Sequence, residues 1–138
     1  MIILDTNVLS AVMRMKPEPA VVAWLNDQPL ESVWVTAFTI YEVRFGIELL
    51  PSSKKRMSLL ESFHSFLDAI DHRISPFDAA AGEQAASLMA RRQKAGRPID
   101  LRDTMIAGIA LARRATLATR NRIHFADAGI TILDPWAE

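Results

Sequence analysis

Met1-Ile2-Ile3-Leu4-Asp5-Thr6-Asn7 is the stretch of sequence from which the fold can be predicted. The apolar run 2–4 is typical of a short buried strand, and Asp5 follows it directly. A carboxylate is therefore expected at the exit of this strand. Alternatively, Asp5 is only the cap of a helix that begins near Asn7. The stretch alone supports both interpretations.

Short apolar runs and longer helical periodicities alternate along the remainder of the chain. Further strands are expected at 33–35, 74–77, 116–119 and 130–133, and helices at 7–13, 21–25, 37–50, 53–70, 78–94 and 103–114. This alternation predicts a single domain, residues 1–138, with an α/β fold: a three-layer α/β/α sandwich around a mainly parallel sheet. In such sheets ligands bind beyond the carboxyl ends of the strands, which is where Asp5 lies.

The composition excludes several classes of protein and of site. Of the residues, 50% are hydrophobic and 23% are charged, as in an ordinary globular protein. The sequence contains no cysteine, which excludes disulfides, a thiolate nucleophile and a cysteine-ligated zinc site. The N-terminus shows neither a signal peptide nor a membrane-spanning run. We therefore expect a cytoplasmic protein that does not enter a membrane.

The net charge of zero hides a basic segment between residues 91 and 122. The arginines and lysines of this segment are opposed only by Asp100 and Asp103. Such a segment can attract a phosphate backbone electrostatically. Arginine-rich surface helices are also common in other proteins, and the overall pI of about 6.8 does not indicate a nucleic-acid-binding protein. The segment supports RNA binding only together with other observations.

Glu42 occupies an unusual position in the helix expected at 37–50. At about 100° per residue, Arg44 and Glu48 lie within about 40° of each other and define the polar face. Glu42 lies about 160° from Arg44, between Phe38 and Phe45 on the apolar stripe. A carboxylate there is desolvated and needs a partner. Glu42 therefore either binds a metal or takes part in a buried salt bridge, unless it lies at the rim of the stripe.

Asp103 comes at the start of the helix expected at 103–114, and it either caps this helix or contributes a third carboxylate to a site. Asp100 is interpreted as a cap or as a surface charge. Asp5, Glu42 and Asp103 come from separate elements that can converge at one edge of a parallel sheet. Clustered carboxylates repel one another unless a cation neutralises them. Oxygen ligands without cysteine or a histidine pair favour Mg²⁺ or Mn²⁺ over zinc.

Four motifs, in this order, resemble the PIN-domain family, and most closely its VapC- and FitB-like toxins. They are Met-Ile-Ile-Leu-Asp-Thr-Asn-Val-Leu-Ser at 1–10, Thr-Ile-Tyr-Glu-Val-Arg-Phe-Gly at 39–46, Arg-Asp-Thr-Met-Ile-Ala-Gly at 102–108 and Leu-Ala-Thr-Arg-Asn at 117–121, with Leu-Asp-Pro-Trp closing the chain at 133–136. The resemblance covers nearly the whole sequence. It implies a small α/β/α fold and Mg²⁺-dependent endoribonuclease activity in the toxin of a type II toxin–antitoxin module.

The resemblance also implies partners for this chain. RNA would be its substrate, and a second copy of the chain would form a homodimer with it. A cognate VapB- or FitA-like antitoxin would block the site and bind operator DNA, which this chain would reach only through the antitoxin. The apolar excess of residues 21–50 supports an interface with a second copy or with an antitoxin.

The family's first three acids correspond to Asp5, Glu42 and Asp103, which are therefore the expected catalytic residues and metal ligands. The fourth acid of many members is here Asn121. Its amide supplies no charge, so a second metal would be held more weakly. Asp127 could substitute only if the following loop folded back, which we do not expect.

Other residues of these motifs have expected supporting roles. Hydrogen bonds from Thr6, Asn7, Thr119 and Asn121 are expected to orient the carboxylates. Capping or turn formation would explain the same residue types. Arg120 and Arg122 are expected to hold the RNA backbone.

Other function classes fit the sequence less well. A phosphoryl-transfer enzyme of the haloacid-dehalogenase type has a second acid two positions after its first aspartate, where this chain has Asn7. A serine hydrolase is disfavoured because His64, His72 and His124 lie beside no serine elbow, and we interpret them as ordinary surface or boundary histidines. The remaining alternative is a PIN-fold binding protein that cleaves poorly because of Asn121 and acts mainly in an antitoxin–operator DNA complex.

Overall fold

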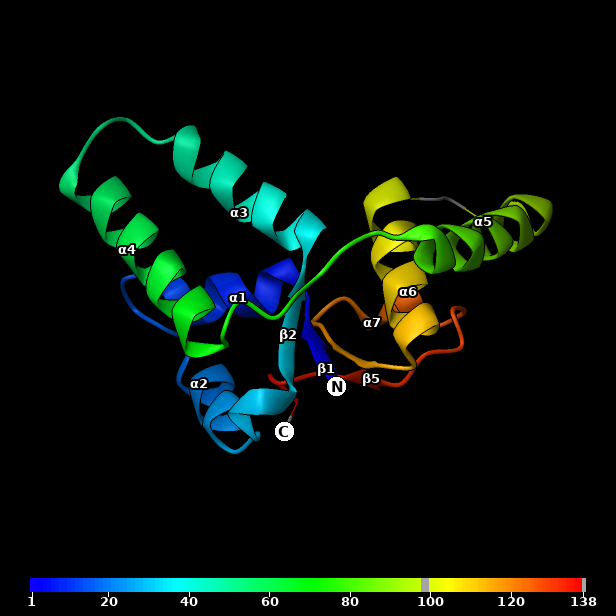
Figure 1. The fold of residues 1–138 in the computed structure, drawn as a ribbon, viewed down its shortest axis with the longest axis horizontal. Coiled ribbons are helices and arrows are strands. Elements are labelled where there is room, and N and C mark those ends of the chain that lie inside the picture. Colours follow the sequence, from blue (N-terminus) through cyan, green and yellow to red (C-terminus); the bar gives the residue numbers. More distant parts are fainter. Residues whose placement is uncertain (98–99, 138) are drawn as a thin grey trace.

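A parallel sheet forms the centre of the molecule (Figure 1). The computed structural model describes residues 1–97 and 100–137. In these residues the strands are β1 (Ile2–Leu4), β2 (Val33–Thr36), β3 (Ile74–Ser75), β4 (Thr116–Ala118) and β5 (Ile132–Leu133), in the order β3-β2-β1-β4-β5. Each neighbouring pair is parallel. The order places a topological switch point between β1 and β4, where parallel sheets bind ligands.

Helices cover both faces of the sheet (Figure 1). One layer consists of α1 (Thr6–Met13), α2 (Pro19–Asn26), α3 (Ala37–Glu48) and α4 (Lys54–Ala69), with a short 3-10 helix at Leu30–Ser32 before β2. The opposite layer consists of α5 (Ala79–Lys94), α6 (Leu101–Arg113) and α7 (Arg122–Phe125). The predicted α/β/α fold with a parallel central sheet is confirmed.

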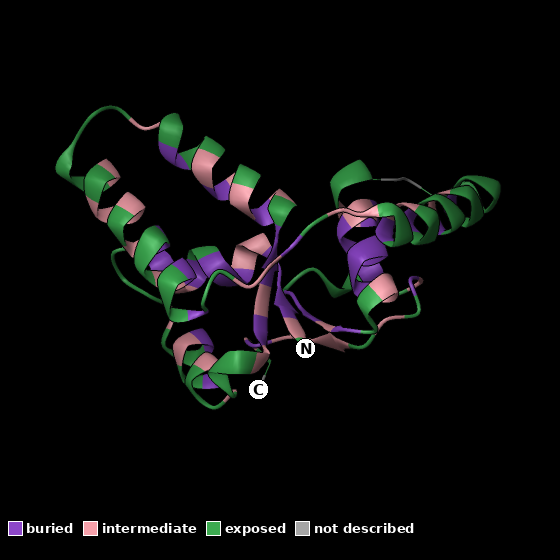
Figure 2. Ribbon diagram, in the orientation of Figure 1, coloured by how far each residue is buried: buried purple, intermediate pink, exposed green. Residues whose placement is uncertain are grey.

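Alternate residues of the strands fill two hydrophobic cores, one on each face of the sheet. Leu4 and Ala118 are fully buried in the core that α1, α3 and α4 help to form. Their sequence neighbours Ile3 and Leu117 are fully buried in the core formed with α5 and α6. This division follows from the two-residue repeat of a strand. Figure 2 shows the result: the inner sides of the helices are buried and their outer sides are exposed.

Gly108 allows α5 and α6 to lie very close together. A Cβ atom at this position would lie 2.6 Å from the carbonyl oxygen of Ala81 and 2.7 Å from the Cβ of Ala85. Any side chain at position 108 would therefore force the two helices apart. The contact bears on the site because α6, which it holds in place, contributes Asp103 to the cavity described below.

The structure corrects the bounds of several predicted elements, and for two of them the reason is local. The third strand ends at Ser75, because Pro76 has no backbone N–H to donate to the sheet. The helix predicted to begin at Asp103 begins at Leu101 instead, and its cap is Asp100. Among the described helices, none combines the length and the apolar content that crossing a bilayer requires.

Candidate active site

Asp5 and Thr119 meet at the switch point between β1 and β4. Leu4 pairs with Ala118 in the sheet, so the residues that follow them are neighbours at its carboxyl edge. The N–H of Asp5 donates to the carbonyl of Ala118 at 2.9 Å. The hydroxyl of Thr119 donates to Oδ2 of Asp5 at 2.8 Å. The register of the sheet therefore places a hydroxyl against a carboxylate that is only 5% exposed.

Asp5 also caps the helix that follows it. Its Oδ1 accepts the N–H of Thr6 at 2.8 Å, at the start of α1. Both interpretations of Asp5 therefore hold, since it is the N-cap of α1 and a carboxylate at the exit of β1. With one oxygen bound to the backbone and the other to Thr119, the carboxylate has a defined orientation.

Glu42 lies in the second turn of α3 and is bound at both carboxylate oxygens. Thr6 Oγ1 donates to Oε1 at 2.9 Å, and Arg102 Nη1 donates to Oε2 at 2.8 Å. Its side chain is 21% exposed, so it lies at the rim of the apolar face with a cation as partner. Of the alternatives left open for Glu42, the structure agrees with a position at the rim of the stripe and an ion pair, and Phe45, expected on the same stripe, is 53% exposed. The buried residues of α3 are Thr39, Val43 and Ile47.

Asp103 lies in the first turn of α6 and contacts α7. Its N–H donates to Oδ1 of Asp100, the cap of α6, at 3.0 Å. Its Oδ2 lies 2.9 Å from Nδ1 of His124. His124 is exposed at the surface, as predicted, but its contact with Asp103 was not foreseen. No local pattern could have revealed this contact, because the two residues are 21 positions apart and meet only through the packing of α6 and α7.

A cavity of about 320 Å³ brings the three predicted acids together. Asp5, Glu42 and Asp103 line it together with Asp100 and Asn121. Its other lining residues are Thr6, Asn7, Arg102 and His124. The cavity lies at the carboxyl edge of the sheet, where the topology predicts a ligand site.

Burial and mutual repulsion raise the pKa of two carboxyl groups in this cavity. Burial is the largest cause for Asp5, whose pKa is raised further by the charges of Asp103 and Glu42, against the lowering effect of its hydrogen bonds. The pKa of Asp103 is also raised, first by burial and then by the charge of Asp100. Carboxylates that raise one another's pKa form a site that a cation would stabilise.

The donor atoms of the cavity suit a hard divalent cation. They are carboxylate and amide oxygens, the ligands that Mg²⁺ and Mn²⁺ prefer. Within residues 1–97 and 100–137, no three carboxylate or imidazole groups are already placed around one point as metal ligands would be. Glu42 and Asp103 are instead engaged with Arg102 and His124. The residues fit the chemistry of such an ion, and its binding would compete with these two contacts.

Thr119 is the centre of a small hydrogen-bonded group beside Asp5. Its hydroxyl oxygen accepts the backbone N–H of Asn121 at 3.1 Å. The amide nitrogen of Asn7 lies 3.4 Å from both Thr119 Oγ1 and Asp5 Oδ2, and its Oδ1 accepts the N–H of Arg120 at 3.3 Å. The structure therefore brings the predicted supporting residues Asn7, Thr119 and Asn121 together around Asp5.

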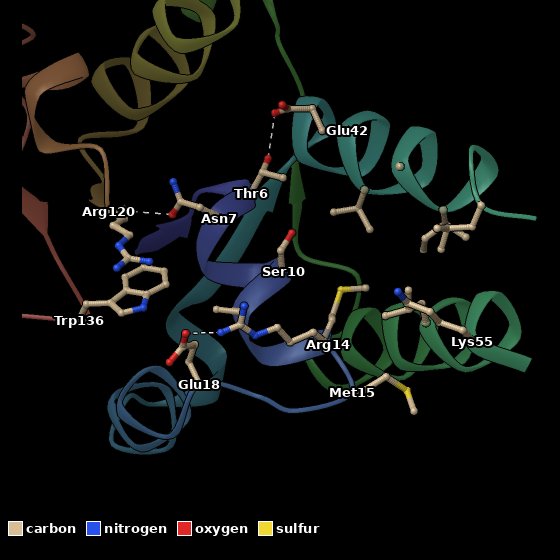
Figure 3. A pocket seen from close by; sticks show the side chains of 17 residues that line it. Thr6, Asn7, Ser10, Arg14, Met15, Glu18, Glu42, Lys55, Arg120 and Trp136 are labelled. Atoms are coloured by element: carbon tan, nitrogen blue, oxygen red, sulfur yellow. Dashed lines mark hydrogen bonds and ion pairs between the residues drawn. The ribbon is translucent and has the colours of Figure 1, made fainter.

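A larger cavity of about 500 Å³ adjoins the first, since Thr6, Asn7 and Glu42 line both. Figure 3 shows Arg120 against Trp136 at one side of this cavity. The guanidinium carbon of Arg120 lies 4.8 Å from the centre of the Trp136 ring. The Arg120 cation is thus stacked on an aromatic face, and it lines the larger cavity together with Glu42.

The basic segment 91–122 is partly neutralised within the molecule. Arg92 and Arg97 both pair with Asp127. Arg102 forms a salt bridge with Glu42, and Arg113 forms one with Asp78. Arg122 is exposed at the start of α7, and none of the described contacts joins it to the acids.

Asp127 does not take the place of a fourth acid. Arg92 Nη2 and Nε donate to its two carboxylate oxygens at 2.8 and 3.0 Å, and these bonds are the largest cause of its lowered pKa. Its carboxylate is therefore engaged on the side of α5. The expectation that Asp127 stays out of the acidic site agrees with this placement.

Comparisons with known proteins identify relatives that match nearly the whole chain. The PIN domain family matches residues 2–130. The chain is 37% identical over 137 residues to VapC ribonuclease Y4jK of Sinorhizobium fredii, covering 99% of this chain and 98% of that protein. It is also 37% identical to toxin FitB of Neisseria gonorrhoeae, covering 99% of both. A solved structure of FitAB bound to an IR36 DNA fragment is similar with a TM-score of 0.90 at 37% identity, covering 99% of this chain and 96% of that chain.

Proposed function

Because the chain belongs to the PIN-domain family, within its group of VapC- and FitB-type toxin ribonucleases, we propose that it cleaves RNA phosphodiester bonds as a Mg²⁺-dependent endoribonuclease. One observation supports this most: Asp5, Glu42 and Asp103, from three separate elements, line one cavity at the carboxyl edge of the sheet. The raised pKa values of Asp5 and Asp103 are expected for carboxylates assembled to bind a cation.

Asp5, Glu42 and Asp103 would hold the Mg²⁺ ion, which Mn²⁺ can replace. When bound, such an ion polarises a phosphate and lowers the pKa of water. The other residues act on the carboxylates. Thr119 and the N–H of Thr6 orient Asp5, while the Thr6 hydroxyl orients Glu42.

Asn7 and Asn121 would complete the surroundings of the acids. Asn7 bridges Asp5 and the backbone of Arg120, so it couples the acids to the basic side of the site. Asn121 lines the cavity and contributes an amide without charge. Arg120, beside the larger cavity, and the exposed Arg122 would bind the phosphates of the RNA backbone on either side of the scissile bond.

We assign protein partners to an exposed apolar stripe formed by α3 and its C-cap Leu49. Tyr41, Phe45 and Leu49 are 60%, 53% and 69% exposed and lie four residues apart, and the two aromatic rings are stacked. A VapB- or FitA-like antitoxin and a second copy of the chain are the proposed partners, with operator DNA bound only through the antitoxin. Light scattering of the isolated chain tests the homodimer, and a clean monomer would leave the antitoxin as the partner of this stripe.

The activity is tested with the Asp5→Asn variant. A fluorescently labelled single-stranded RNA should be cleaved by the native chain when Mg²⁺ or Mn²⁺ is added and should stay intact in excess EDTA. Asp5→Asn should abolish cleavage while the far-ultraviolet circular dichroism remains native. Asp27→Asn is the matched control, because Asp27 is an exposed carboxylate beyond the end of α2. Native rates in a folded Asp5→Asn protein would refute the mechanism.

A second function, as a binding protein that cleaves poorly, is favoured by one observation. Asn121 lines the acidic cavity where many family members have a fourth acid. A native chain that binds its antitoxin tightly but cleaves no RNA at any metal concentration would support this alternative.

A further inference from the structure

Arg92 is a buried arginine with no role in the proposed reaction. It lies in the last turn of α5 and is 4% exposed. Its Nη1 donates to Thr104 Oγ1 at 2.9 Å, and its Nη2 donates to the carbonyl oxygen of His124 at 2.7 Å. Its Nε and Nη2 also donate to the two carboxylate oxygens of Asp127. We refer to Arg92, Thr104, His124 and Asp127 as the Arg92 network.

The chemistry of this network depends on a guanidinium group. Burying a cation is unfavourable unless its N–H groups are bound and its charge is balanced. Asp127 binds Arg92 through two parallel hydrogen bonds and balances the charge, which leaves N–H groups of the same planar group for Thr104 and His124. A lysine at position 92 could still pair with Asp127, but it could not hold three partners in this planar arrangement.

The network lies directly behind the third acid of the site. Thr104 follows Asp103 in the first turn of α6. His124, whose carbonyl group binds Arg92, presents its ring to Oδ2 of Asp103 at 2.9 Å. Arg92 therefore contacts both the helical turn that contains Asp103 and the segment that contains the partner of Asp103.

We propose that Arg92 is a positioning residue for Asp103: by holding Thr104 and the His124 carbonyl together, it sets the orientation of the Asp103 carboxylate in the cavity. This inference rests on the proposed function, in which Asp103 is a metal ligand. A residue that only stabilised the fold would leave Asp103 unaffected in the folded protein. A folded variant of Arg92 therefore distinguishes the two roles. A positioning role predicts a changed Asp103 carboxylate, and a purely stabilising role predicts an unchanged one.

The test compares Arg92→Lys with Arg73→Lys. Arg73 is a matched control, because its guanidinium also joins distant segments, donating to the carbonyl of Val33 at 3.0 Å and to that of Leu30, at the amino end of β2. Two properties are measured on folded full-length protein: the ring resonances of His124 by NMR without metal, and the affinity for Mn²⁺ by calorimetry. Assignment of the His124 resonances uses a His124→Gln variant.

We expect Arg92→Lys to shift the His124 resonances and to weaken Mn²⁺ binding about tenfold, the size of effect seen when groups behind metal ligands are altered. The kcat for RNA cleavage should fall with little change in KM. Arg73→Lys should change none of these, even where it lowers the melting temperature as much. Native His124 resonances and native Mn²⁺ affinity in folded Arg92→Lys, or equal changes in Arg73→Lys, would overturn the proposal.

A second variant covers the case in which Arg92→Lys does not fold. Thr104→Val removes the hydroxyl that accepts from Arg92 Nη1 and donates to the carbonyl oxygen of Asp100 at 2.9 Å, and it should shift the His124 resonances in the same direction. Unchanged resonances in Thr104→Val would then refute the positioning role. If the native chain binds no Mn²⁺ and cleaves no RNA, the proposed function fails. The His124 resonances of the metal-free variants still decide whether Arg92 positions the Asp103–His124 pair.

Discussion

Arg102 Nη1 lies 2.8 Å from Oε2 of Glu42, although 60 residues separate the two in the chain. The pair joins α6 to α3 across the acidic cavity, and both residues line it. The Arg102 side chain is 57% exposed, and exposed ion pairs contribute little to stability. The main effect of Arg102 is therefore electrostatic, because its guanidinium occupies an oxygen that a divalent cation would use.

Arg102→Gln should strengthen metal binding. Removing a positive charge beside the acids favours a cation, and we expect about a threefold gain in Mn²⁺ affinity at low ionic strength, with a smaller gain in high salt. Calorimetric titration measures the Mn²⁺ affinity at low ionic strength and in high salt. Arg113→Gln is the control, since Arg113 forms a similar pair with Asp78 at the opposite end of α6. Equal affinities of Arg102→Gln and the native chain at low salt would contradict the prediction.

Asp5 should make the native chain less stable as the pH rises. Its pKa in the folded protein is raised above 3.8, so the folded state holds the proton more tightly than the unfolded state does. Stability is therefore lost as the pH rises from 3.8 through the raised pKa. Urea unfolding of Asp5→Asn and the native chain, in EDTA, should show a difference that shifts in favour of the variant over this range. A difference that is constant with pH would show that Asp5 is not destabilised by burial.

Asp127 should have the opposite dependence on pH. Its pKa is lowered first by its hydrogen bond from Arg92, so its contribution to stability is present above 3.8 and is lost as the pH falls through the lowered pKa. Asp127→Asn leaves the buried Arg92 without its counter-charge and should cost about 3 kcal/mol at neutral pH. Urea unfolding should show this loss at pH 7 and a much smaller one in acid. An equal loss at both pH values would mean that the charge of Asp127 is not what stabilises the network.

Gly108→Ala should destabilise the contact between α5 and α6. The added Cβ would lie 2.6 Å from a backbone oxygen, and overpacking of this kind costs about 2 kcal/mol. Differential scanning calorimetry should show a lower melting temperature. Gly46→Ala is the control, because a Cβ at this exposed position of α3 meets nothing within 4 Å and should stabilise the helix by about 0.5–1 kcal/mol. A rise in melting temperature for both variants would show that α5 and α6 can separate freely.

Asn121→Asp should raise activity with Mn²⁺. The change adds a charged oxygen ligand to the cavity that Asp5, Glu42 and Asp103 line, and affinity for hard cations increases with ligand charge. We expect cleavage of labelled RNA at limiting Mn²⁺ to rise about tenfold. Asp5→Asn combined with Asn121→Asp is the control and should stay inactive. Unchanged cleavage in the single variant would mean that the amide already serves the reaction as well as a carboxylate does.

Local patterns in the sequence predicted the frame of the fold well. Ile2–Leu4 is a buried strand with a carboxylate at its exit. The helix predicted from Asp78 to Lys94 is α5, and Asp78 Oδ1 caps it by accepting the N–H of Ala81 at 3.0 Å. Such features depend on residues within one turn of helix or one strand. They can therefore be recognised without knowing the rest of the structure.

The sequence by itself determined the succession of strands and helices along the chain. It also marked Asp5, Glu42 and Asp103 as carboxylates in positions that need an explanation. Only the tertiary structure decided what these carboxylates contact. Arg102 binds Glu42, His124 binds Asp103, and Arg92 lies behind that pair. Periodicity and capping act over a few residues, whereas these contacts join positions 21 to 60 residues apart. They exist only because the parallel sheet and the packing of α3, α6 and α7 bring those positions to one edge of the molecule.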